Sequence, residues 1–263
     1  MFKYTGIRVG ADPELFIRRK GTTIFFPACG LVGGTKQRPK KIDNRGHAVQ
    51  EDNVMVEFNI RPAKTRGEFV ESNKFVLGYL TAALPEFDLD ICASARFDEA
   101  LLAKAGYQAM VFGCDPDYNA WTWEVNSSPE ARTNLRTAGG HIHIGYKNPA
   151  INNQVELIRA MDLFLGVPSI ILDKDVERRQ RYGKAGAFRP KEYGTEFRTV
   201  SNFWLKSEEL MGWAYDNAVR AVDFLNKGET ISKKLGIAIQ HCINNNNKEQ
   251  ATGLCKEFAL LPR

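Results

Sequence analysis

Long hydrophobic runs are missing from this 263-residue chain, and cysteine is scarce. The longest nearly apolar stretches, Phe75 to Leu84 and Phe164 to Leu172, are far shorter than the roughly 20 residues of a membrane-spanning helix. The five cysteines form no Cys-x-x-Cys pair, so neither a disulfide framework nor a thiolate zinc site is indicated. The segment from Met1 to Phe16 has no apolar core of a secretory signal. We therefore expect a cytoplasmic protein with reduced thiols and no membrane partner.

Several common catalytic signatures are also absent. The sequence has no His-Glu-x-x-His, no Gly-x-Ser-x-Gly, and no Gly-x-Gly-x-x-Gly followed by a helix. Residues 30–36 are superficially similar to a phosphate-binding loop, but Thr35 stands where a glycine should precede the lysine, so a turn is the better interpretation. The net charge of +5 suits an anionic ligand such as a nucleotide. Because the basic residues form no long stripe, a nucleic-acid partner is not indicated.

The composition is that of an ordinary globular protein, with 43% hydrophobic and 25% charged residues. Helix and strand signals alternate irregularly without a linker or a repeat, which predicts a single α+β domain over residues 1–263, helical from about residue 206. Thr65 and Glu68 form a capping box before an apolar stripe, which predicts a helix to about residue 83. Asn153 and Ser207 can cap two further helices.

Strands are expected between and around these helices. The segments with strand character are 7–10, 14–19, 22–27, 53–60, 121–126, 140–146 and 194–200. Residues 173–193 are rich in Arg and Lys and contain turn residues, so they are predicted to form a long ordered loop, where functional residues often lie.

Polar residues suited to metal and phosphate chemistry recur at i, i+2 spacing in the strand segments, so the members of each pair point to one face. Pro13 keeps Asp12 extended, and Asp12 and Glu14 should project to the same side. In the second segment, positions 51, 53, 57 and 59 share one face and Val54, Val56 and Phe58 share the other. Polar strand faces are also common on solvent-exposed sheet surfaces, and that alternative stays open for each segment.

Two histidines and a glutamate–arginine pair show the same spacing further along the chain. His141 and His143 alternate with isoleucines and are flanked by glycines, which permit close approach of the backbone. Glu196 and Arg198 share a face, and the preceding residues supply donors that suit phosphate oxygens: Arg178, Arg179, Arg181, Lys184 and Arg189. The alternatives are structural histidines and an ion pair within one strand beside a solvated basic loop.

A meeting of these acids at one site would favour a divalent cation. The acids concerned are Asp12, Glu14, Glu51, Glu57 and Glu196. Each like-charge pair at ~4 Å costs about 4 kcal/mol at an effective dielectric constant of about 20. Carboxylates and a neutral imidazole suit Mg²⁺ or Mn²⁺, whose other positions are normally filled by water and substrate phosphates. The sequence itself does not require the strands to converge.

Three segments resemble strands of the glutamine synthetases, in the same chain order. Residues 10–16 resemble their opening Glu-Pro-Glu-Phe strand, residues 141–143 their His-x-His strand, and residues 196–198 their Glu-x-Arg strand. A wider set that includes residues 113–117, 138–146 and 181–204 closely resembles the phage-type carboxylate-amine ligases called type 2. The resemblance covers roughly residues 8–205.

This resemblance implies a glutamine synthetase-like catalytic fold, in which a curved antiparallel sheet carries helices on its outer face and binds nucleotide and substrate on its concave side. It implies one metal held by Asp12, His141 and Glu196, and another held by Glu14, Glu51 and Glu57. The implied catalytic residues are Arg198, Arg189, Arg181 and Glu57, and the implied ATP-binding residues are Arg198, Arg181, His143 and Lys184.

The activity implied by the resemblance is ATP-dependent amide formation. Transfer of the γ-phosphoryl group activates a carboxylate as an acyl phosphate, and an amine then displaces phosphate. Mg²⁺ or Mn²⁺ would be the cofactor, ATP the cosubstrate, and small-molecule or peptide carboxylates and amines the substrates, in the host cytoplasm if the protein is phage-encoded. An acyl phosphate must be kept from water, so residues 173–193 or 33–36 are candidates for a mobile cover. A metal-dependent hydrolase and a noncatalytic Mg-nucleotide-binding protein on the same fold are the alternatives.

Overall fold

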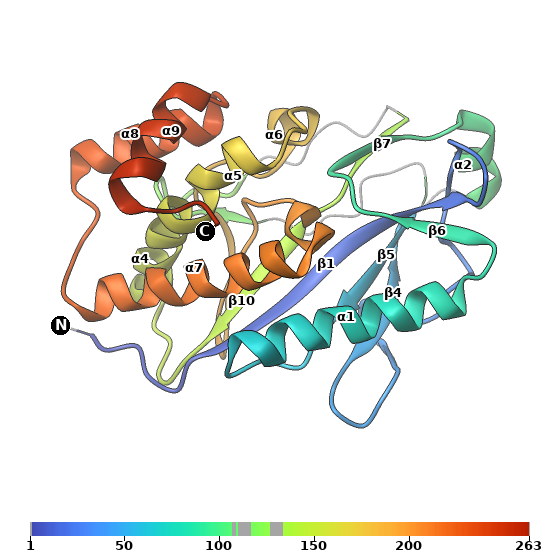
Figure 1. The fold of residues 1–263 in the computed structure, drawn as a ribbon, viewed down its shortest axis with the longest axis horizontal. Coiled ribbons are helices and arrows are strands. Elements are labelled where there is room, and N and C mark those ends of the chain that lie inside the picture. Colours follow the sequence, from blue (N-terminus) through green and yellow to red (C-terminus); the bar gives the residue numbers. More distant parts are fainter. Residues whose placement is uncertain (1, 107–108, 110–116, 127–133, 263) are drawn as a thin grey trace.

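The structure is a computed structural model that describes residues 2–106, 109, 117–126 and 134–262. These residues form an α+β fold in which helices pack on a large antiparallel sheet (Figure 1). The sheet contains ten strands: β1 (Arg8–Arg19), β2 (Phe25–Phe26), β3 (Lys40–Lys41), β4 (Ala48–Asp52), β5 (Met55–Asn59), β6 (Phe87–Asp90), β8 (Tyr118–Asn119), β10 (Gly140–Gly145), β11 (Ala187–Lys191) and β12 (Gly194–Phe197). Its main path runs β3-β4-β5-β1-β10-β12-β11-β8, and β2 and β6 pair with β1. A second sheet pairs β7 (Ser94–Arg96) with β9 (Leu135–Thr137).

The central strand β1 separates a core face from a polar face. The sequence predicts two short strands here, at 7–10 and 14–19, but one continuous strand runs through Pro13. Val9, Leu15 and Ile17 are buried in the hydrophobic core that also contains residues of α1 and α7. Asp12 and Glu14, which alternate with them, project to the opposite face.

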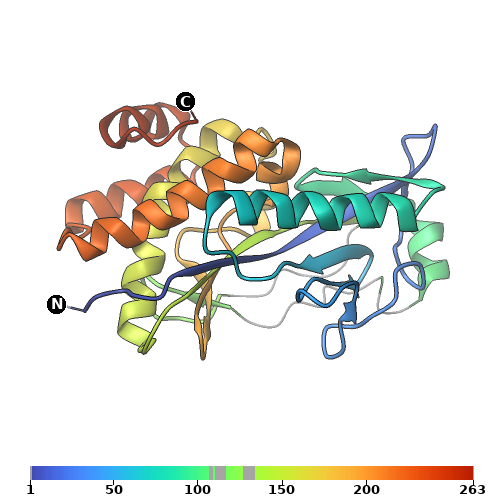
Figure 2. The ribbon, with the colours of Figure 1, turned by 60° about the horizontal axis from the view of Figure 1, so that its bottom comes forward.

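The helices are α1 (Arg66–Ala83), α2 (Glu99–Ala105), α4 (Ile151–Met161), the π-helical η1 (Asp162–Gly166), α5 (Val167–Leu172), α6 (Glu177–Arg181), the 3-10 helix η2 (Asn202–Lys206), α7 (Glu208–Asn226), α8 (Lys233–Asn244) and α9 (Lys248–Phe258). Figure 2 shows α1, in teal, and α7, in orange, on the same side of β1, and the two helices pack against each other. None of the helices described is long and apolar enough to cross a membrane.

Two of the three predicted helix caps are confirmed. Thr65 accepts a hydrogen bond from the Glu68 N–H at the start of α1, and Ser207 accepts one from the Leu210 N–H at the start of α7. The prediction for Asn153 is wrong, because α4 already begins at Ile151.

Some other predicted elements also differ from the structure. Residues 173–193 are not one loop, because they contain α6 and β11. Residues 121–126 form a turn after β8 rather than a strand, and the only bridge found there pairs Val125 with Tyr118. The segment 53–60 begins with a turn, and β5 follows it. The strand predicted at 140–146 is confirmed as β10.

Candidate active site

A small pocket of about 170 Å³ lies on the polar face of the sheet. It forms where β1, β10, the β4–β5 hairpin and the β11–β12 hairpin meet, so the strands predicted to carry functional residues do converge. Its charged lining consists of the acids Asp12, Glu14, Asp52, Glu57 and Glu196, the cations Lys36, Arg189, Lys191 and Arg198, and His141. We refer to it as the acidic pocket.

Strand register explains why these side chains meet. In antiparallel pairs, residues directly opposite each other project to the same face. Asp12 lies opposite His141, Glu14 lies opposite Glu57, and Glu196 lies opposite His143. Three neighbouring strand pairs therefore place acids and imidazoles on one surface.

Asp12, His143 and Glu196 form the first cluster that could hold a metal ion. One ligand atom from each lies within 4.8 Å of the others. Asp12 Oδ1, His143 Nε2 and Glu196 Oε2 are buried and make no hydrogen bond of good geometry within the described part of the chain. Their charged neighbours are close, however: His143 Nε2 lies 2.8 Å from Asp12 Oδ1, and Lys191 Nζ lies 2.7 Å from Glu196 Oε2. Buried polar atoms without hydrogen bonds of good geometry are costly unless a further group satisfies them. These atoms therefore fit a divalent cation.

Tyr193 sets the orientation of the His143 ring. Its hydroxyl oxygen lies 2.6 Å from His143 Nδ1. When Nδ1 carries the ring proton and donates a hydrogen bond to the Tyr193 oxygen, Nε2 keeps its lone pair, which a metal-ligating histidine requires. This lone pair points toward Asp12. His141, which the resemblance implies as the ligand, lies beside this cluster, with Nδ1 3.4 Å from Asp12 Oδ1 and 3.2 Å from Arg198 Nη1.

Glu14, Asp52 and Glu57 form a second cluster, again with ligand atoms within 4.8 Å of one another. The structure does not bring Glu51 to it. The Glu51 carboxylate instead accepts hydrogen bonds from the backbone N–H groups of residues 30, 32 and 33, at 2.8 to 3.1 Å. Glu51 thus holds this loop in place, and Asp52 supplies the third carboxylate.

A turn at Asn53 is the reason that Asp52, and not Glu51, belongs to the second cluster. The interpretation of residues 51–59 as one strand is wrong, because β4 ends at Asp52 and Asn53 has a left-handed φ of 60°. The chain therefore reverses between β4 and β5, and Gln50 pairs with Glu57 while Glu51 pairs with Val56. Because of this turn, the even-numbered residues of β4, Gln50 and Asp52, share a face with Glu57, and Glu51 lies on the other face.

The two clusters differ in their electrostatics. Burial acts to raise the pKa of Asp12, but His143 and His141 hold that pKa well below its usual value. Burial and Asp12 act to raise the pKa of Glu196, but Arg198 and the histidines lower it to about 2. In the second cluster, burial and the charge of Glu14 raise the pKa of Asp52 to about 6, and burial with neighbouring acids raises that of Glu57 well above its usual value. The second cluster thus has too little neighbouring positive charge to keep its carboxyls ionised as readily as those of the first cluster.

The β11–β12 hairpin supplies most of the basic groups. Arg198 pairs with Glu196 through Nη1, and its Nε donates to Asp117 Oδ2 at 3.1 Å. Arg189 Nη1 lies 3.7 Å from Glu196 Oε1, and Lys191 Nζ lies 2.7 Å from Glu196 Oε2. Lys191 is missing from the sequence-based predictions, although its i, i+2 spacing from Arg189 is the same signal that identified Glu196 and Arg198.

The other predicted basic residues lie elsewhere. Arg181, which ends α6, and Lys184 are not among the residues that line the acidic pocket. Arg178 is buried and donates to the backbone oxygens of Thr199 and Arg198, so it supports the strand end that carries Arg198. Of the candidate covers, residues 33–36 contribute Lys36 to the pocket, and residues 173–193 contribute Arg189 and Lys191 from β11. Gly113 to Pro116 of the resembling segment lie outside the described residues.

The glycines before His141 allow close packing, as predicted. A Cβ atom at Gly140 would overlap the Ser201 carbonyl and lie 2.6 Å from Trp204 Nε1, which donates a hydrogen bond to the Gly140 oxygen. A Cβ atom at Gly139 would overlap the ring of His141. The absence of these side chains thus lets β10 pack on η2 and lets His141 lie against the backbone.

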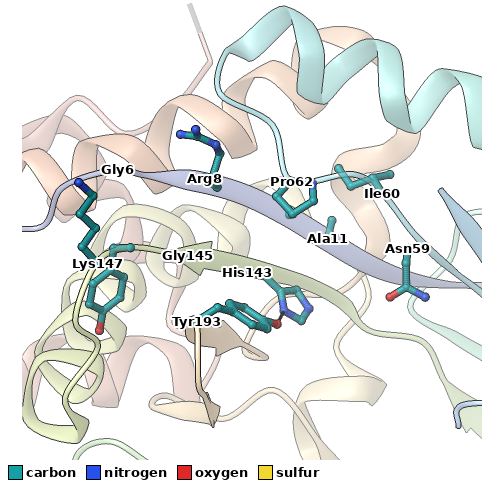
Figure 3. Close-up of a pocket in the computed structure, with 12 residues that line it drawn as sticks. Gly6, Arg8, Ala11, Asn59, Ile60, Pro62, His143, Gly145, Lys147 and Tyr193 are labelled. Atoms are coloured by element: carbon teal, nitrogen blue, oxygen red, sulfur yellow. Dashed lines mark hydrogen bonds between the residues drawn. The ribbon is translucent and has the colours of Figure 1, made fainter. Parts of the chain in front are cut away.

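A larger pocket of about 550 Å³ adjoins the acidic one. His143 lines it, and Asn59 lines both pockets. Figure 3 shows the rings of His143 and Tyr193 close together below β1, with Ile60 and Pro62 along the segment that follows β5. We call it the neighbouring pocket; it offers ring faces and aliphatic surface next to the first cluster.

Part of the chain matches a known protein family, and that part includes β10, β11 and β12 of this site. Residues 118–220 match the family model of the phage phiEco32-like COOH.NH2 ligase-type 2. The match confirms the resemblance found in the sequence over that range, and the family's name describes a carboxylate-amine ligase. The range includes His141, His143, Glu196 and Arg198, whereas β1 and the β4–β5 hairpin precede it. No curated protein matches the chain.

Proposed function

We propose that this protein is an ATP-dependent carboxylate-amine ligase with a glutamine synthetase-like catalytic fold, forming an amide through an acyl phosphate. The observation that carries the proposal is the acidic pocket, in which two carboxylate clusters face arginine and lysine side chains. The match to the COOH.NH2 ligase-type 2 family over residues 118–220 supports the reaction class. Phosphoryl transfer needs positioning and charge neutralisation more than a protein nucleophile, and the pocket offers those groups.

The residues present fit two divalent cations. Asp12, His143 and Glu196 would hold one, because their buried ligand atoms have no hydrogen bond of good geometry in the described structure. Glu14, Asp52 and Glu57 would hold the other, since three carboxylates at this separation repel one another. Mg²⁺ or Mn²⁺ bound here would neutralise phosphate oxygens of the nucleotide.

The chain's own cations would bind the phosphates from the other side. Arg198 is buried and held by Glu196 and Asp117, so its guanidinium is fixed before any substrate arrives. Arg189 projects from the adjacent strand into the same pocket. The neighbouring pocket, with its apolar and aromatic lining, would take the nucleoside of ATP, and the side of Glu14, Asp52 and Glu57 would receive the carboxylate and the amine.

The decisive experiment is incubation with Mg-ATP, a panel of small-molecule and peptide carboxylates, and hydroxylamine. The proposal expects ADP and hydroxamate to form in equal amounts, only when a suitable carboxylate is present. Release of AMP would indicate an adenylate mechanism and would refute the acyl phosphate. Turnover of a carboxylic amide without ATP would identify a hydrolase, and bound but intact ATP throughout the panel would identify a nucleotide-binding protein.

A further inference from the structure

Glu196 is surrounded by cations at both of its carboxylate oxygens. Oε1 faces the guanidinium of Arg198, and Arg189 Nη1 is 3.7 Å away from it. Oε2, the oxygen that could serve the first cluster, lies 2.7 Å from Lys191 Nζ. Glu196 is 1% exposed, so this contact is sheltered from water on the carboxylate side. Lys191 therefore stands where a metal ion bound to Oε2 would place its positive charge.

Lys191 differs from the two arginines in its freedom to move. The side chain of Arg198 is 8% exposed and bonded to Asp117 and Glu196, whereas the side chain of Lys191 is 32% exposed. Only its backbone is fixed, by pairing with Gly194 and by two hydrogen bonds with the side chain of Gln154. A lysine carries its charge on a flexible four-carbon stem, so the ammonium group can leave Oε2 while the strand stays in place.

We propose that Lys191 is a mobile counter-ion of Glu196 that occupies the first metal position when no metal is bound, and moves to a phosphate group of the nucleotide when the metal enters. Two cations cannot both lie against Oε2 in a buried pocket without strong repulsion. The displaced ammonium group remains within the acidic pocket, where the substrate phosphates bring new negative charge. The second half of this inference rests on the proposed function, and the first half does not.

The test measures binding rather than turnover. Mn²⁺ binding to the full-length protein without nucleotide is followed by electron paramagnetic resonance for the native protein, Lys191→Met and Lys191→Gln. Lys227→Met, at the exposed end of α7, is the control for loss of one positive charge. The native protein and the control should bind Mn²⁺ alike, and both Lys191 variants should bind it at least 10-fold more tightly. Affinities within twofold of the native protein would overturn the counter-ion role.

A second measurement addresses the phosphate. With Mn²⁺ saturating, the affinity for a nonhydrolysable ATP analogue is measured by calorimetry in the same four proteins. Both Lys191 variants should bind the analogue at least 10-fold more weakly, and Lys227→Met should bind it as the native protein does. Equal affinities would refute the transfer to phosphate. Failure of the native protein to bind Mn²⁺ at all would refute the metal site itself, which is distinguishable from failure of the Lys191 inference.

Discussion

Asp162 is a fully buried carboxylate that holds three separate segments together. Its Oδ2 accepts hydrogen bonds from Trp121 Nε1 at 2.7 Å and from the Gly186 N–H at 2.6 Å. Its Oδ1 accepts one from Thr199 Oγ1 at 3.1 Å. Burial raises the pKa of this carboxyl from its usual 3.8 to about 7, against the lowering effect of these donors. Asp162 should therefore make the stability of the fold depend on pH.

The sign and size of the effect follow from the two pKa values. Between about pH 4 and pH 7, Asp162 loses its proton in the unfolded chain but keeps it in the folded one, so rising pH destabilises the fold. Below this range both states are neutral, and above it the cost is constant. With pKa values of 3.8 and about 7, the cost is about 1–2 kcal/mol at pH 5 and about 4 kcal/mol at pH 8. The free energy of unfolding should thus fall by about 2–3 kcal/mol over that interval through Asp162 alone.

The Asp162→Asn variant isolates this contribution because it does not titrate. The asparagine oxygen can accept from Trp121 and Gly186, and its amide can donate to Thr199 Oγ1. The single hydroxyl proton of Thr199 can then bond to the Lys184 oxygen, 3.1 Å away. Urea unfolding, followed by tryptophan fluorescence in the presence of a chelator, gives the free energy of unfolding of both proteins from pH 5 to pH 8. The variant should gain about 2–3 kcal/mol of unfolding free energy relative to the native protein across this range.

Asp223→Asn, on the exposed surface of α7, is the matched control, because it removes one carboxylate without changing a buried group. Its stability relative to the native protein should not change with pH in this interval. If the difference between Asp162→Asn and the native protein also stays constant within about 0.5 kcal/mol, burial does not raise the pKa of Asp162 as argued.

Three further predictions concern the site. In a Mn²⁺ titration, Glu51→Gln should leave the Mn²⁺ affinity within about threefold of native. Asp52→Asn should remove one bound Mn²⁺ at micromolar metal. If the two variants bind Mn²⁺ equally, the assignment of Asp52 to the second cluster is refuted. Gly140→Ala should lower the free energy of unfolding by at least about 3 kcal/mol in urea, because its Cβ lies 2.6 Å from Trp204 Nε1, and a change below about 1 kcal/mol would contradict that packing. Glu196→Gln should lower hydroxamate formation at least 100-fold, about 2.7 kcal/mol, with unchanged circular dichroism; near-normal rates would exclude it from the site.

The sequence predicts those parts of the site that lie within single strands. Alternation along β1, β10 and β12 is local, so Asp12 with Glu14, and Glu196 with Arg198, could be assigned to common faces before any fold was known. Their convergence could not, because it depends on the pairing of β1 with β10 and of β10 with β12. Only the family resemblance indicated that pairing in advance.

The β4–β5 hairpin shows where alternation fails. A polar pattern that continues smoothly from Glu51 to Asn59 looks like one strand, but the left-handed backbone at Asn53 reverses the chain. Asparagine tolerates this conformation better than most residues, so Asn53 was the available signal for a turn. A single continuous strand would place Glu51, instead of Asp52, on the face of Glu57, because a shift of one residue in register moves every side chain to the other face of the sheet.

The distribution of charge in the acidic pocket explains why the two clusters need metal ions to different degrees. Glu196 already has Arg198 and Lys191 against its oxygens, and Asp12 has two imidazoles, so the negative charge of the first cluster is partly balanced by the chain itself. The ligand atoms of Glu14, Asp52 and Glu57 lie within 4.8 Å of one another, and burial together with the neighbouring acids raises the pKa values of Asp52 and Glu57. A divalent cation at the second cluster would therefore relieve repulsion, whereas one at the first must displace a cation that the chain itself provides.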